Sequence, residues 1–163
     1  MKSQKVKIKS VRFLRKVIGL TMALLLLTIG YIPESRACTR VVYKGPNNTV
    51  LTGRTMDFSL EIPANQWIFP RGIQRNGEVG KNSIEWTSKY GSLAVSSWDI
   101  STTDGMNEKG LVANMQWLVE SEYPTFDKEG SKKGMAISLW AQYVLDNFAT
   151  VAEAVSALEK ETF

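Results

Sequence analysis

The chain has 163 residues, with 20 lysines and arginines against 16 aspartates and glutamates, no histidine and one cysteine. The lack of histidine excludes Ser-His-Asp and Cys-His catalytic arrangements within this chain, and most zinc sites as well. Residues 1–37 hold eight of the basic residues and one acidic residue, which leaves 12 basic and 15 acidic residues beyond them, a net charge of about −3. Nothing in residues 38–163 therefore favours nucleic acid or an anionic membrane as a partner.

The first 37 residues have the three parts of a secretory signal. A basic stretch runs to Lys16, an apolar run covers residues 17–32, and the small-x-small ending is Ser35-Arg36-Ala37. We therefore expect residues 1–37 to be a signal peptide that is cleaved before Cys38. The mature protein is then secreted or periplasmic, in a bacterium that we expect to be Gram-negative.

Two other readings of this leader are open. An uncleaved apolar run of about 16 residues is short for a membrane span, which needs roughly 20, so we expect no stable membrane anchor. A lipoprotein signal also ends in cysteine, but Ser35 stands where such signals usually have leucine, and Arg36 is a poor neighbour. Because a cysteine does stand at the cleavage site, a non-catalytic envelope lipoprotein acylated at Cys38 stays open as the first alternative to a soluble enzyme.

Cleavage before Cys38 would place a thiol and a free α-amine on the same residue. An α-amine has a pKa of roughly 7.7 to 8.0 and can accept a proton near neutral pH. The amine can thus serve as the base that histidine supplies elsewhere, as in enzymes with an N-terminal threonine. The position of the cysteine predicts an N-terminal nucleophile.

Beyond Cys38 the pattern predicts short strands and then helices. The expected strands are residues 39–43 and 50–54, joined by the turn residues 45–48, and then 66–69, 84–87, 93–97 and 111–118. Asp104-Gly105 and Lys109-Gly110 are expected to be turns before the last strand. Strands followed by helices favour an α+β fold with a layered antiparallel sheet.

The C-terminal stretch has helical spacing. Its amphipathic face is formed by Met135, Leu139, Trp140, Tyr143, Val144 and Phe148. Thr150 and Glu153 have the spacing of a capping box, which predicts a further helix from residue 151 to about 160.

Four motifs in order along the chain carry a resemblance. They are Cys38-Thr39-Arg40, Gly53-Arg54-Thr55-Met56-Asp57, the stretch DGMNEKGL at 104–111 and the stretch ANMQWL at 113–118. Together they resemble the choloylglycine hydrolase family, which contains conjugated bile salt hydrolases and penicillin V acylases. The resemblance implies the four-layer αββα fold of N-terminal nucleophile hydrolases, no cofactor, and a small-molecule amide substrate. Conjugated bile acids, penicillin V and acyl homoserine lactones are all candidate substrates.

The resemblance also implies roles for particular residues. Cys38 would attack the substrate amide through sulfur, and Arg54 and Asp57 match the family's pair beside the nucleophile. A cation beside a thiol favours the thiolate, and a carboxylate can orient an α-ammonium; a strand-end ion pair of little consequence is the alternative. Trp117 matches an oxyanion-hole contributor, or else is a buried strand aromatic, and Asn114 is a further substrate-site candidate.

Three other polar and aromatic positions are weaker candidates. Asn107 lies in a Gly-flanked acidic stretch and is best explained as turn chemistry. Trp67 and Phe69 either face a substrate groove or pack against the core.

The family's members are about twice as long as residues 38–163. We therefore expect residues 38–163 to be the N-terminal portion of a choloylglycine hydrolase-like domain that would form a homo-oligomer at full length. An inactive truncated remnant is the remaining alternative.

Overall fold

The computed structural model describes residues 16–22, 38–58, 60–118, 120–123, 125–126 and 129–160. The chain divides into two compact units, Met1–Ser35 and Arg36–Phe163. In the first unit, residues 16–22 form an exposed helix. No helix among the described residues is long and apolar enough to cross a membrane. The other residues of the predicted leader, including the cleavage motif at Ser35 to Ala37, lie outside the described residues.

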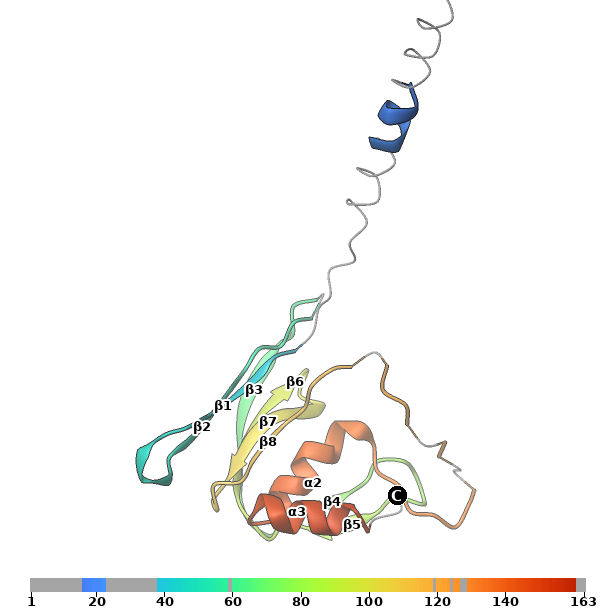
Figure 1. Ribbon diagram of the computed structural model, residues 1–163. Helices are drawn as coiled ribbons and strands as arrows, with labels where there is room; N and C mark the ends of the chain where they lie inside the picture. The colour runs from blue at the N-terminus through green and yellow to red at the C-terminus, as the bar shows by residue number, and fades with distance from the viewer. Residues whose placement is uncertain are drawn as a thin grey trace, which may run out of the picture. The chain divides into compact units, whose positions relative to one another are not determined.

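The second unit contains a four-stranded antiparallel sheet with the strand order β3-β6-β7-β8. Its strands are β3 (Ala64–Phe69), β6 (Ser92–Ser97), β7 (Ser101–Asn107) and β8 (Val112–Asn114). Two further strand pairs are the hairpin β1 (Arg40–Lys44) and β2 (Val50–Arg54), and β4 (Gln74–Asn76) with β5 (Glu85–Thr87). The helices are α2 (Trp140–Asn147) and α3 (Val151–Leu158). Short 3-10 turns cover Pro46–Asn48 and Ile137–Leu139. The helices lie on one side of the sheet and the β1–β2 hairpin on the other (Figure 1). The mixed helix and sheet architecture agrees with the predicted α+β class.

The β1–β2 hairpin forms where the sequence predicts it. Arg40 pairs with Arg54 across the two strands, and Gly45 N–H donates to the carbonyl of Thr49 at 2.8 Å to close the turn. Asn47 and Asn48 both have positive φ, 55° and 59°, a conformation that asparagine tolerates better than most residues. The turn chemistry therefore fixes the register of the strand that follows Cys38.

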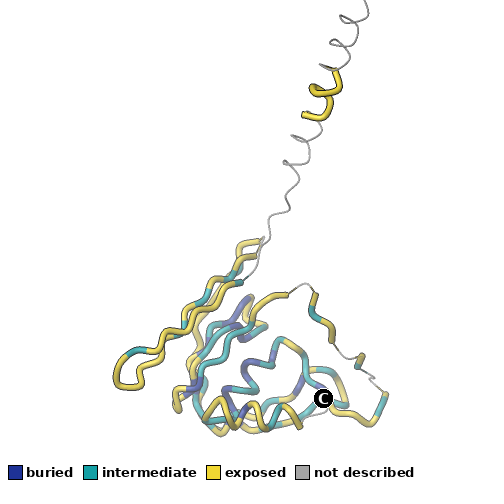
Figure 2. Tube along the Cα trace, in the orientation of Figure 1, coloured by how far each residue is buried: buried dark blue, intermediate teal, exposed yellow. Residues whose placement is uncertain are grey.

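Helix α2 packs on the middle of the sheet, where the most deeply buried residues lie (Figure 2). A Cβ at Gly105 would come within 2.5 Å of Leu145 Cδ1, so only glycine lets the helix approach β7 this closely. The buried Gln142 accepts a hydrogen bond from Thr102 Oγ1 at 2.9 Å and donates one to Asp146 Oδ1 at 2.8 Å. Trp86 Nε1 also donates to Asp146, at 2.8 Å. The contact between helix and sheet thus combines one large apolar side chain with a satisfied polar network.

Three sequence expectations need correction. Asp104-Gly105 is not a turn but part of β7, because the space beneath Leu145 requires a glycine within the strand. The strand expected over residues 111–118 ends at Asn114. The α2 helix is present, but its fully buried face consists of Ala141, Gln142, Leu145 and Asp146. The expected Trp140, Tyr143 and Val144 are half-buried, because hydrogen bonds let polar side chains occupy the centre.

Helix α3 has the predicted cap. Thr150 Oγ1 accepts a hydrogen bond from Glu153 N–H at 3.2 Å. The Glu153 carboxylate in turn accepts from Ala149 N–H at 2.8 Å, one residue before the cap. The capping prediction is confirmed.

Asn107 ends β7, where its side chain is 2% exposed and carries the turn chemistry that the sequence predicts. Its Oδ1 accepts hydrogen bonds from the N–H groups of Lys109 and Leu111, at 3.0 and 3.1 Å. Its Nδ2 donates to the carbonyls of Leu145 and Phe148, at 2.9 and 2.7 Å. Asn107 therefore joins the turn to the end of α2.

We expect Asn107→Ala to lower the free energy of unfolding by about 3 kcal/mol, because it leaves several buried backbone groups without partners. Urea denaturation followed by circular dichroism measures this loss. Asn76→Ala is the matched control, since Asn76 is an exposed asparagine whose side chain accepts a single backbone hydrogen bond, from Glu78 N–H at 2.8 Å. Equal losses in the two variants would contradict the role assigned to Asn107.

The sheet face opposite α2 is apolar and open among the described residues. Ile68, Leu93 and Met106 are aligned across β3, β6 and β7, and they are 83%, 46% and 51% exposed. A contiguous apolar row of this kind usually marks a surface that another layer covers. The β1–β2 hairpin, which carries Cys38 at its start, lies on this side of the sheet (Figure 1).

Candidate active site

Cys38 lies directly before β1, at the end of the hairpin farthest from its turn. Thr55 N–H donates to the carbonyl of Thr39 at 2.9 Å, so the strand register continues beyond β1 and sets Cys38 opposite Met56. Both side chains line a cavity of about 240 Å³. The hairpin therefore delivers the half-buried thiol to the border of a pocket.

Most of the wall of this pocket is apolar. Phe58 packs edge-on against Trp98, at a centroid separation of 5.9 Å, and against Trp117, at 6.4 Å. Met115, Ile62 and Ile137 add to the apolar wall, and the hydroxyl-bearing Ser97, Ser101, Thr103 and Ser138 also line the pocket. A site of this kind suits a small, flat, apolar group whose reactive end lies beside the thiol.

Trp98 is held in an uncommon backbone conformation. Trp98 and Asp99 have φ of 52° and 54°, and Ile100 N–H donates to the Ser97 carbonyl at 3.1 Å to close the β6–β7 turn. A bulky residue in the left-handed region is strained, and such strain is concentrated at functional sites. The turn keeps this strained residue in the wall of the Cys38 pocket.

The neighbouring Asp99 carboxylate holds this turn in place. It accepts hydrogen bonds from Asn65 Nδ2 at 2.9 and 3.0 Å, from Ser96 Oγ at 2.8 Å and from Trp67 Nε1 at 3.0 Å. The hydrogen bonds from Asn65, Ser96 and Trp67 lower the pKa of Asp99 below its ordinary value.

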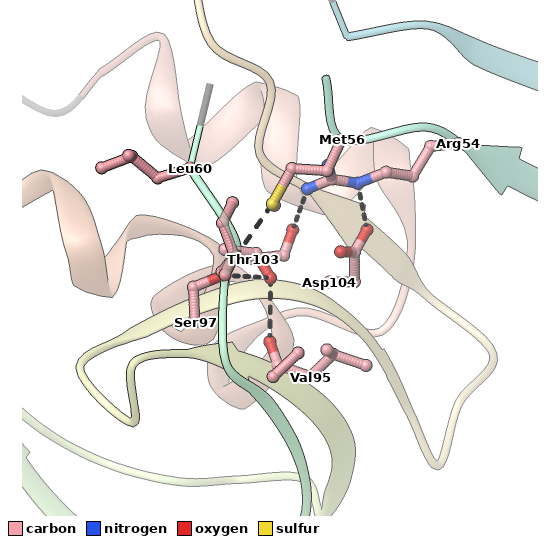
Figure 3. A pocket seen from close by; sticks show the side chains of 9 residues that line it. Arg54, Met56, Leu60, Val95, Ser97, Thr103 and Asp104 are labelled. Atoms are coloured by element: carbon pink, nitrogen blue, oxygen red, sulfur yellow. Dashed lines mark hydrogen bonds and ion pairs between the residues drawn. The ribbon is translucent and has the colours of Figure 1, made fainter. Parts of the chain in front are cut away.

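Arg54, at the end of β2, has a side chain that is 7% exposed and fully occupied by partners. Its Nε donates to Asp104 Oδ1 at 2.8 Å (Figure 3). Its Nη2 donates to the carbonyl of Met115 at 2.7 Å. These contacts lie beside a second cavity of about 470 Å³, which Arg54 and Asp104 both line. Met56 and Thr103 line this cavity and the Cys38 pocket, so the two cavities are neighbours.

Asp57 is exposed and connects to the residue after Cys38 through one hydroxyl group. Thr55 Oγ1 donates to Asp57 Oδ2 at 3.1 Å and accepts from Thr39 N–H at 3.2 Å. Among the described contacts Arg54 forms its ion pair with Asp104, 50 residues away, and not with Asp57. The alternative of a strand-end pair between Arg54 and Asp57 is therefore wrong.

The other predicted site residues separate into two groups. Trp117 lies beyond the end of β8, is 62% exposed and lines the Cys38 pocket, so the alternative of a buried strand aromatic is wrong. Asn114 does not line that pocket; its Nδ2 donates to Asp104 Oδ1 at 2.7 Å, and its buried Oδ1 has no partner among the described residues. The sequence did not indicate Asp104 as a site residue, because Asp-Gly is a common turn pair.

Trp67 and Phe69 lie outside the pocket wall. Their rings stack with a centroid separation of 6.3 Å, and the Arg75 guanidinium lies 4.5 Å from the Phe69 ring centre. Trp67 also donates to Ser96 Oγ at 3.1 Å. The structure therefore gives both residues packing roles on the sheet.

The fold places this chain among the N-terminal nucleophile hydrolases, of whose αββα fold it contains a part. It belongs to the family described as linear amide C–N hydrolases, choloylglycine hydrolase family, whose pattern matches residues 38–163. The resemblance read from the four sequence motifs is thereby confirmed.

Two curated relatives and two solved structures illustrate the match. The chain is 50% identical over 149 residues to a penicillin V acylase of Pectobacterium atrosepticum, covering 87% of this chain and 39% of the relative. It is 32% identical over 126 residues to a bile salt hydrolase/transferase of Clostridium perfringens, covering 75% of this chain and 37% of the relative. The structure of penicillin V acylase from Agrobacterium tumefaciens superposes with a TM-score of 0.72 and 59% identity, covering 76% of this chain and 38% of that one. The structure of a mutant conjugated bile acid hydrolase from Clostridium perfringens superposes with a TM-score of 0.61 and 27% identity, covering 77% of this chain and 38% of that one.

The chain thus spans less than two fifths of the length of these relatives. The match to the Pectobacterium enzyme covers 87% of this chain. Residues 38–163 make up a smaller share of the chain than that, so the match also includes residues before Cys38. A segment similar to part of the predicted leader is therefore present in that relative.

Proposed function

We propose that this chain supplies the nucleophile and the acyl pocket of an exported amidase that hydrolyses small linear amides. The observation that carries the proposal is the placement of the half-buried Cys38 at the border of an apolar pocket, directly before the first strand. Removal of residues 1–37 would give that thiol an α-amine as its own base. No cofactor enters this chemistry.

The reaction follows from the groups around the thiol. The Cys38 α-amine takes the thiol proton, and the sulfur attacks the amide carbonyl carbon. The carbon–nitrogen bond then breaks as the leaving amine takes the proton from the α-ammonium, which leaves a thioester on Cys38. Water, deprotonated by the same amine, attacks the thioester; the carbon–sulfur bond breaks, the acid leaves and the thiol is restored.

Two kinds of group assist these steps. The backbone N–H of Trp117 would donate to the negative oxygen that develops on the substrate carbonyl. Asp57, which reaches the Thr39 N–H through the Thr55 hydroxyl, would orient the α-ammonium of the preceding residue. Arg54 would supply positive charge beside the site and hold the Met115 carbonyl.

Two observations favour an aryloxyacetyl amide such as penicillin V over a conjugated bile acid. The pocket beside Cys38 has a volume of about 240 Å³, below the roughly 300–1,000 Å³ of clefts that hold drug-sized ligands, and a phenyl ring fits it better than a four-ring steroid. The chain is also 50% and 59% identical to two penicillin V acylases, against 32% and 27% to the two bile salt enzymes.

The test compares the hydrolysis of two amides, penicillin V and glycocholate. Since the chain spans 39% of the Pectobacterium enzyme, the assay uses this chain as given and also a completed enzyme, in which the part of that enzyme beyond the match follows residue 163. We expect the completed enzyme to release acid from penicillin V at least about 10-fold more efficiently than from glycocholate. Failure to hydrolyse either amide, with the Pectobacterium enzyme active in parallel, would overturn the proposed function.

The pocket assignment predicts a specific effect of Trp98→Gly in the completed enzyme. The change removes one aromatic wall and also relieves the positive φ of this position, so stability is expected to be retained while KM for penicillin V rises about 10-fold. Ile100→Ala is the matched control, because Ile100 lies in the same turn, is exposed and does not line the pocket. Steady-state kinetics and thermal melting measure both effects. An unchanged KM in the Trp98 variant would remove this residue from the acyl pocket.

A further inference from the structure

The pairing of β6 with β7 is irregular beside the candidate site. Val95 pairs with Asp104 and Ser96 pairs with Thr102, so that Thr103 is an extra residue in β7. In a regular strand, Thr103 and Asp104 would point to opposite faces of the sheet. The bulge instead lets both line the cavity beside Arg54, as Figure 3 shows. Bulges often serve to redirect a side chain next to an active site.

Asp104 uses this position to hold two groups at once. Its Oδ1 accepts hydrogen bonds from Arg54 Nε at 2.8 Å and from Asn114 Nδ2 at 2.7 Å. Asp104 holds Arg54 Nε, and Nη2 of the same guanidinium donates to the carbonyl of Met115 at 2.7 Å and to the carbonyl of Thr103 at 3.4 Å. The Asp104 carboxylate thus fixes Arg54 between the hairpin, β7 and the segment after β8.

The segment that Arg54 holds is the one that reaches the pocket. Met115 and Trp117 both line the pocket beside Cys38, and Asn114, the residue before Met115, is held by Asp104 directly. The hairpin that ends in Arg54 also carries Cys38. One carboxylate therefore connects the strand of the nucleophile to the backbone that carries the proposed oxyanion donor.

We propose that Asp104 is a positioning residue of the amidase, which acts through Arg54 to fix the backbone at residues 115–117 relative to Cys38. This inference rests on the proposed function. It assigns Asp104 no contact with substrate. Loss of this contact should disturb the geometry that stabilises the transition state more than it disturbs ground-state binding, so its effect falls on kcat rather than on KM.

The test is a double-mutant cycle in the completed enzyme, with kcat expressed per reactive thiol, determined by titration with an alkylating reagent. This normalisation corrects for protein whose thiol is oxidised or blocked, and thermal melting of each variant measures whether it is folded. We expect Asp104→Ala to lower kcat about 100-fold with KM changed less than about 3-fold. Asp104→Asn, which keeps an acceptor oxygen but loses the charge, should lower kcat about 10-fold. In the Arg54→Ala background, Asp104→Ala should cause no further loss, because the two residues act as one unit.

Glu108→Gln is the matched control. Glu108 follows β7 directly and pairs with Arg71 through two hydrogen bonds at 2.5 Å, so it is also a carboxylate in an ion pair, but it lines neither of the two cavities. We expect kcat per thiol to be unchanged in this variant.

Three outcomes would count against the inference. An unchanged kcat per thiol in Asp104→Ala, or independent losses that add in the double variant, would overturn it and leave the proposed function intact. A parent enzyme that hydrolyses no amide would overturn both.

Discussion

Replacing Cys38 by serine in the completed enzyme is expected to lower amide hydrolysis by roughly 10³-fold or more, to the level of background. An alcohol is a far weaker nucleophile than a thiol near neutral pH, and the α-amine proposed as the base removes a proton from an alcohol far less readily than from a thiol. The rate of acid release from penicillin V measures the effect.

Two controls make this result specific to the nucleophile. The mass of the exported Cys38→Ser variant shows whether its leader is still removed, so that a processing defect is not read as a catalytic one. Ser97→Ala removes a different group from the same pocket wall and should retain most of the activity. Parental rates in a correctly processed Cys38→Ser variant would exclude the thiol as the nucleophile.

The second large effect is expected from Asp57→Asn, which should lower turnover by about 10²-fold with little loss of stability. The carboxylate is exposed, so its removal costs the fold at most about 1 kcal/mol. Its position, one hydroxyl group away from the Thr39 N–H, suits it to orient the neighbouring α-ammonium, and loss of that orientation impairs the general base.

The matched control for this prediction is Glu61→Gln, which removes a carboxylate from the same exposed stretch of chain. Steady-state kinetics and thermal melting of both variants distinguish a catalytic role of Asp57 from a purely structural one. If Asp57→Asn keeps the parental turnover, Asp57 is a surface residue and the case for catalysis depends on Cys38 alone.

The sequence predicted those parts of the fold that depend on local chemistry. The β1–β2 hairpin follows from two β-rich runs around Gly45-Pro46-Asn47-Asn48, and the start of α3 follows from the spacing of Thr150 and Glu153. Cys38 was identified as the candidate nucleophile from local sequence as well, because it stands next to a predicted leader.

The missed features depend on contacts between distant segments. Asp-Gly is an ordinary turn pair, so nothing local indicates that Gly105 makes room for Leu145 or that Asp104 pairs with Arg54. The burial of Gln142 in α2 likewise depends on hydrogen-bond partners from the sheet. Hydrophobic periodicity cannot identify a polar residue whose partners lie 40 or 50 residues away.

The bulge at Thr103 shows why the site was harder to predict than the fold. Strand alternation would place only one of Thr103 and Asp104 on the side of the nucleophile, whereas the irregular pairing with β6 brings both there. A bulge has no dependable signal in a single sequence, because it depends on the register of two strands.

The central claim is that the mature protein begins with a free Cys38, and intact-mass spectrometry of the exported chain tests it most directly. We predict a single species that starts at Cys38, carries no lipid and gains one adduct when the thiol is alkylated. A species heavier by hundreds of daltons would identify a lipoprotein in which the thiol is blocked. A mature chain that starts at any other residue would leave the thiol without its α-amine and would contradict the mechanism.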